Sequence, residues 1–137
     1  MTSPSAVALA GLIAWALSLL ILMESLRGFL LLFKGVSVKA FTPDNANLSP
    51  FMQRLARAHA NCVEGLPIFG GVLILALLTG QTELTDPLAY ILLLARLVQS
   101  CIHVASTGVL AIYLRFAAFA VQLIIAAYWM VRLLWVI

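Results

Sequence analysis

The stretch SAVALAGLIAWALSLLILM, residues 5–23, runs without a single charged side chain. A helix of this length rises about 28 Å at about 1.5 Å per residue, close to the bilayer's hydrocarbon thickness of about 30 Å. No basic segment precedes the stretch, and no small-residue cleavage site follows it. We therefore expect a retained first transmembrane helix and not a secretory signal peptide.

The composition of the whole chain indicates the same class of protein. Of its 137 residues, 64% are hydrophobic and only 9% are charged, which is far from the composition of a soluble domain. Four spans of about 20 residues with short loops fill this length, so we expect one membrane domain over residues 1–137. The net charge of +3 is small and dispersed, and it argues against a nucleic-acid partner.

Turn-forming residues divide the chain into four apolar segments. Ser49 followed by Pro50 is typical of a helix N-cap and first helical position. Trp129 and Trp135 are predicted to anchor the last helix at the membrane surface. The predicted fold is an all-α integral membrane bundle of four transmembrane helices, at about residues 5–33, 50–80, 87–106 and 111–136.

The distribution of charge predicts an orientation in the membrane. The first loop and its flanks carry four basic residues, Lys34, Lys39, Arg54 and Arg57, whereas the second loop carries only Glu83 and Asp86. The positive-inside rule then places the first loop in the cytoplasm and both termini outside. The turn between the third and fourth helices falls on the cytoplasmic side as well.

Two polar stripes enter the membrane near that side. Arg57, Asn61 and Glu64 lie within about 60° of one another on a helix, whereas His59 points elsewhere. Ionisable groups at membrane depth are costly and persist mainly where they face protein, water or a ligand. The rim around Arg57 therefore suits an anionic polar ligand, and an apolar second substrate would arrive from the lipid.

The second stripe lies on the third helix, where Arg96, Ser100 and His103 repeat the spacing and Gln99 flanks them. Arg96 lies nearer mid-membrane and needs a partner, for which Glu64 is a candidate. Two interpretations stay open for such groups. They bind a ligand, or they form a network that only holds the helices together.

Other polar residues fit structural roles. Glu24 and Arg27 lie one helical turn apart and are expected to neutralise each other. Cys62 and Cys101 stand singly in apolar segments, with neither a metal-type spacing nor partner ligands nearby. We therefore predict no metal site.

Residues 57–64, RAHANCVE, followed by PIF at 67–69, resemble the second-helix signature of the MAPEG family, the membrane-associated proteins in eicosanoid and glutathione metabolism. Residues 95–103 and 114–116 resemble bacterial members, so the resemblance spans nearly the whole chain. It implies a homotrimer of four-helix bundles in a bacterial inner membrane, with active sites between subunits. Many members conjugate the thiol of glutathione, as co-substrate, to a lipophilic electrophile, or reduce lipid hydroperoxides.

The resemblance also implies roles for individual residues. Arg115 is the candidate catalytic residue, because a nearby guanidinium lowers the pKa of a thiol from about 8.5 and so favours the nucleophilic thiolate. Arg96 and Gln99 would hold the ligand-binding residues in place without contacting glutathione themselves. The residues expected to bind glutathione are Arg57, His59, Asn61, Glu64 and His103.

Departures from the family pattern keep other functions open. Gly65 stands where leukotriene-forming relatives have a tyrosine, and Gln99 and His103 replace tyrosines of their third helix. The first alternative is a non-catalytic member that binds lipid at the subunit interface. The second is a small proton-coupled exporter that uses Glu24, which leaves the RAHAN run unexplained.

Overall fold

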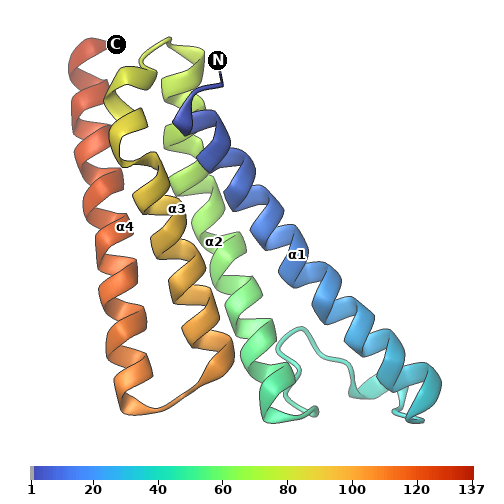
Figure 1. Cartoon of the computed structure of the whole chain (residues 1–137). Helices are drawn as coiled ribbons and strands as arrows, with labels where there is room; N and C mark the ends of the chain where they lie inside the picture. The colour runs from blue at the N-terminus through green and yellow to red at the C-terminus, as the bar shows by residue number, and fades with distance from the viewer. Residues whose placement is uncertain (1) are drawn as a thin grey trace.

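The computed structural model describes residues 2–137 as a bundle of long helices (Figure 1). Each of its four α-helices is long and apolar enough to cross a membrane. The prediction of an all-α, multi-pass membrane protein is thereby confirmed. The elements are α1 (Pro4–Phe33), a short 3₁₀ helix η1 (Val38–Ala40), α2 (Pro50–Leu78), α3 (Thr82–Ala105) and α4 (Val109–Val136).

Hydroxyl caps define where α1 and α2 begin. The Ser3 side chain accepts a hydrogen bond from the Ala6 N–H, and the predicted cap Ser49 accepts one from the Met52 N–H. A proline follows each cap, where its missing N–H leaves no intrahelical bond unmade. The predicted start of the second helix is therefore confirmed.

The start of α3 differs from its prediction. The helix begins at Thr82 and includes Pro87, which the sequence pattern placed at the boundary. Pro87 can lie inside the helix because it removes only the bond to the Glu83 carbonyl, which is in the first turn. Glu83 itself stabilises this turn, since its charge complements the positive end of the helix dipole.

The helices run alternately up and down, so both termini lie at one end of the bundle (Figure 1). The α1–α2 loop and the α3–α4 turn lie together at the opposite end, here called the loop end, as the sequence predicted. α1 packs on α2 and α3, and α4 packs chiefly on α3. The loop end of α2, α3 and α4 can therefore form one site.

The larger of two apolar clusters lies between the helices on the side of the termini and contains Trp129, whose side chain is fully buried, while the second surrounds Leu55 toward the loop end. The predicted role of Trp129 as a surface anchor is therefore wrong. Trp129 shares the buried stripe of α4 with Gln122, Ile125 and Leu133, and this stripe faces the other helices. Trp135, by contrast, is 84% exposed, as an anchor requires.

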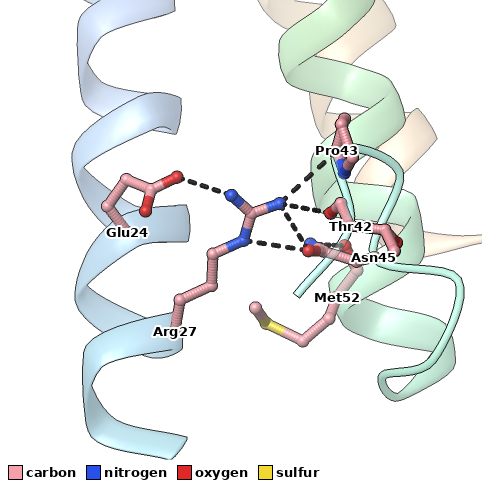
Figure 2. Close-up of polar contacts among 6 residues, drawn as sticks. All are labelled: Glu24, Arg27, Thr42, Pro43, Asn45 and Met52. Carbon is pink, nitrogen blue, oxygen red and sulfur yellow. Dashed lines mark hydrogen bonds and ion pairs between the residues drawn. The ribbon is translucent and has the colours of Figure 1, made fainter. Parts of the chain in front are cut away.

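Arg27 ties the α1–α2 loop to α1 (Figure 2). Its guanidinium donates to the Asn45 side chain, the Thr42 carbonyl and Glu24, which confirms the predicted Glu24–Arg27 pair. Asn45 is buried, has a φ of 54°, and donates in turn to the Met52 carbonyl of α2. The loop is thus held against both helices that it connects.

Candidate functional site

An open groove of about 270 Å³ lies toward the loop end of α2, α3 and α4. It brings together three polar side chains from three helices: Asn61 of α2, Gln99 of α3 and Arg115 of α4. The rest of its lining is apolar and comes from α4, namely Ile112, Phe116 and Phe119.

Two hydrogen bonds join α2 to α3 in this half of the bundle. The Arg54 Nε donates to the Val104 carbonyl at 2.8 Å, which satisfies one of the free carbonyls at the end of α3. Farther into the bundle, the Cys62 thiol and the Ser100 hydroxyl lie 3.2 Å apart and share a hydrogen bond. Cys62 therefore has a structural role, because its contact helps to join α2 to α3.

Arg96 orients Asn61. Its Nη1 donates to both the backbone oxygen and the side-chain Oδ1 of Asn61, each at 3.3 Å. A guanidinium can only donate, so the oxygen of the Asn61 amide must face it. The Nδ2 group is then left on the other side, where Asn61 lines the groove.

The position of Arg96 corrects the predicted pairing with Glu64. Within residues 2–137 the only ion pair is that of Glu24 with Arg27. Arg96 instead packs against the Phe69 ring, with its guanidinium carbon 5.2 Å from the ring centre. A Cβ on Gly65 would lie only 2.5 Å from the Arg96 Nη2, so glycine at this position makes room for the guanidinium.

Gln99 is held in place by a hydrogen bond from α4. Gln122 of α4 donates from its Nε2 to the Gln99 Oε1 at 2.9 Å. No described residue bonds to the Gln99 Nε2, and this nitrogen is not fully buried. Gln99 therefore presents a free N–H donor to the groove, and was predicted only to support the site.

Arg115 supplies the positive charge of the groove. It is partly buried, and its Nε is enclosed without a hydrogen-bond partner among residues 2–137. No carboxylate lines the groove. Asn61, Gln99 and Arg115 thus offer only donors, and an anion with an apolar neighbour is the ligand that this lining suits.

Arg57 extends this positive region toward the loop end, and His103 is a buried neighbour on α3. His103 is buried one turn beyond Gln99 on α3, close enough to Arg57 and Arg115 to experience both charges. Arg57 is exposed on α2, and its charge also acts on Asp44 in the α1–α2 loop. Both residues lie farther toward the loop end than the groove residues of their own helices, and neither lines the groove.

Glu64 and His59, the other two residues of the predicted glutathione set, do not line the groove either. Glu64 is exposed and His59 is partly buried, and neither side chain forms a hydrogen bond or ion pair within residues 2–137. A single chain therefore assembles only part of the predicted set.

Gln122, which bonds to Gln99, was not identified from the sequence as a residue of the site. Its signal was present, because an amide within the apolar run of residues 117–127 is costly in a membrane unless it has a partner.

A family model described as "MAPEG family" matches residues 5–135, nearly the whole chain. Comparison with the curated proteins and with the solved structures gives no match. In the part of the chain that the structure describes, no group of three or more histidine, cysteine, aspartate or glutamate residues is placed to hold a metal ion.

Proposed function

The chain belongs to the MAPEG family, and we propose that it is a glutathione-dependent membrane transferase or peroxidase acting on lipophilic electrophiles or lipid hydroperoxides. The observation that carries the proposal is the groove lined by Arg115 and two amide donors with no carboxylate. Such a lining favours an anionic sulfur over a neutral thiol.

The proposed mechanism is activation of the thiol by charge. Glutathione places its sulfur beside Arg115, whose guanidinium stabilises the thiolate and lowers the thiol pKa from about 8.5. The thiolate attacks an electrophilic carbon and forms a carbon–sulfur bond. The electron pair of the bond broken at that carbon leaves with the departing group or, at a conjugated double bond, moves to the neighbouring carbon, which then takes a proton. With a hydroperoxide it attacks the outer oxygen instead, releasing the alcohol and leaving a sulfenic acid that a second thiol reduces.

The remaining contacts to glutathione would come from α2 and from a second subunit. Arg57 through its charge, and His103 through a ring N–H, suit the carboxylates of the peptide, and Asn61 suits its backbone. Glu64 accepts from an amino or amide N–H. Because the side chains of Glu64 and His59 have no partner among the described residues 2–137, they fit a homotrimer in which glutathione lies between subunits.

An apolar groove next to the site offers a place for the lipophilic substrate. It has a volume of about 480 Å³ and continues along α2 and α4 toward the termini, from Pro67 to Leu75 and from Leu123 to Met130. Phe119 of the polar groove lies one turn from Leu123. An acyl chain in this groove would carry its reactive group toward the sulfur.

The orientation that fits this function has the loop end in the cytoplasm of a bacterium, with both termini outside the inner membrane. The basic residues around the α1–α2 loop support this orientation through the positive-inside rule. Glutathione would then enter from the cytoplasm, and the lipophilic substrate from the bilayer.

Ultraviolet titration of the detergent-solubilised protein with glutathione at neutral pH tests the proposal. We expect thiolate absorbance in the wild type. In Arg115→Ala the thiol pKa should return toward about 8.5, with a larger loss of turnover than of binding. Arg132→Ala is the matched control, since Arg132 is exposed on the same helix and bonds only to Tyr128. A thiolate signal that survives in Arg115→Ala would disprove the role of Arg115.

A non-catalytic lipid-binding protein is the second candidate, favoured by the apolar groove between Pro67 and Met130. Calorimetry separates the two functions. Binding of a fatty acid without binding of glutathione would select the lipid-binding function.

A further inference from the structure

Gln122 is a fully buried amide in the middle of α4. Its Nε2 donates twice, to the Ala118 carbonyl at 3.0 Å and to the Gln99 Oε1 at 2.9 Å. Its own Oε1 is buried and has no partner among residues 2–137. Both hydrogens of the amide are therefore used, while its oxygen is left unpaired.

The Ala118 carbonyl decides how both amides are turned. A carbonyl only accepts, so the Gln122 nitrogen must face it and the Gln122 oxygen must point away. The second hydrogen of that nitrogen requires another acceptor, and within residues 2–137 the oxygen of Gln99 provides it. Gln99 is thereby turned with its Nε2 toward the groove.

The unpaired oxygen indicates that this arrangement has a role beyond packing. A buried acceptor without a partner destabilises the fold, and an aliphatic side chain of similar volume would avoid the penalty. The unpaired oxygen therefore offsets part of what the two hydrogen bonds of Gln122 contribute to stability. What Gln122 does provide is one defined orientation of Gln99.

We propose that Gln122 is a positioning residue that holds Gln99 with its Nε2 donating to the thiolate of bound glutathione. The inference rests on the proposed function. The thiolate would then have two donors, Arg115 and Gln99, and both of these side chains line the groove.

The chemistry of Gln99 explains why it needs such a partner. A tyrosine hydroxyl, which the leukotriene-forming relatives are expected to carry here, is donor and acceptor at one atom and rotates to suit its ligand. A glutamine amide has separate donor and acceptor ends. Without Gln122 it would present its oxygen to the thiolate in some of the molecules, and two acceptors repel each other.

The experiment is a double-mutant cycle read by the pKa of the bound thiol. We expect Gln99→Met to raise that pKa by about one unit, a tenfold loss of thiolate at a given pH, because one hydrogen bond to the charged form is lost. Gln122→Met should raise it in the same direction. In the Gln99→Met background it should have no further effect, since Gln122 acts through Gln99. Gln81→Met, at the opposite end of the bundle, is the matched control.

A purely structural role for Gln122 predicts a different result. Gln122→Met would then change the melting temperature and leave the thiol pKa unchanged, or would raise the pKa equally in both backgrounds. Either result overturns the proposal, and so does an unchanged thiol pKa in Gln99→Met.

Hydrogen exchange separates failure of this inference from failure of the proposed function. In the protein without ligand, the Gln122 side-chain amide protons should be protected, while those of Gln99 should exchange from the groove. The reverse pattern overturns the orientation itself. If the expected pattern appears but the wild type gives no thiolate signal, the glutathione function fails, and the thiolate role of Gln99 fails with it.

Discussion

Replacing Gly65 with alanine would disturb the packing behind the groove. The new Cβ would lie 2.5 Å from the Arg96 Nη2 and 3.1 Å from two carbons of the Phe69 ring. Arg96 is 3% exposed and Phe69 is 2% exposed, and the cavity beside them measures only about 10 Å³, so neither side chain can move far. We expect the guanidinium to move away from Asn61, whose amide is then free to turn.

Three effects set the size of this perturbation. Overpacking a tight core costs about 1 to 3 kcal/mol, and the lost charge-assisted hydrogen bond costs about 1.5 kcal/mol. Alanine recovers about 1 kcal/mol of helix propensity relative to glycine. We expect the free energy of unfolding to fall by about 2 kcal/mol. Glutathione affinity should fall about tenfold, because Asn61 is no longer oriented.

Denaturant unfolding in detergent, followed by circular dichroism, and calorimetric titration with glutathione measure the two effects. Gly28→Ala is the matched control, since a Cβ at this helical position meets nothing within 4 Å. That variant should be neutral or up to about 1 kcal/mol more stable, with unchanged binding. Identical behaviour of Gly65→Ala and Gly28→Ala would refute the packing argument.

Two further predictions concern the α1–α2 loop. Arg27→Met removes the bonds to Asn45 and Thr42, so limited proteolysis should cut the loop faster in this variant than in the wild type. Glu24→Gln is the control, since it loses only an exposed ion pair and should be cut more slowly than Arg27→Met. Equal cleavage rates in the two variants would contradict the role of Arg27. The Thr42 hydroxyl and the Ala46 N–H hold the pKa of Asp44 below its usual value. Because the folded pKa is lowered, the contribution of Asp44 to stability is present above pH about 4 and is lost as the pH falls through the folded pKa. An NMR titration should show that Thr42→Val raises this pKa, and an unchanged value would rule out the hydroxyl as its main cause.

Much of the site was visible in the pattern of residues along each helix. The spacing of Arg57 and Asn61 placed them on one face of α2, and the predicted up-and-down topology brought the α3–α4 turn to the same end. Helical period and chain direction are enough for such statements. They correctly predicted that polar residues of separate helices could meet, as Asn61, Gln99 and Arg115 do in one groove.

The hydrogen-bond partners of individual side chains could not be predicted from the spacing of residues along the helices. Arg96 was expected to reach Glu64 but bonds to Asn61, one turn away on the same helix. The Arg96 guanidinium fills the space that the absent side chain of Gly65 leaves between α2 and α3. In the sequence, Gly65 indicates only that a tyrosine contact is lost. In the bundle, it makes room for Arg96.

Hydropathy, caps and loop charges were sufficient to predict four membrane-spanning helices and the end at which the basic residues gather. Membrane insertion depends on the transfer free energy summed over about 20 consecutive residues, which is a property of each segment alone. Which way the Gln99 amide turns, and whether Trp129 faces lipid or protein, depends on atoms contributed by neighbouring helices. Such contacts are defined only once the helices have packed at a particular distance and rotation, so only the tertiary structure decided them.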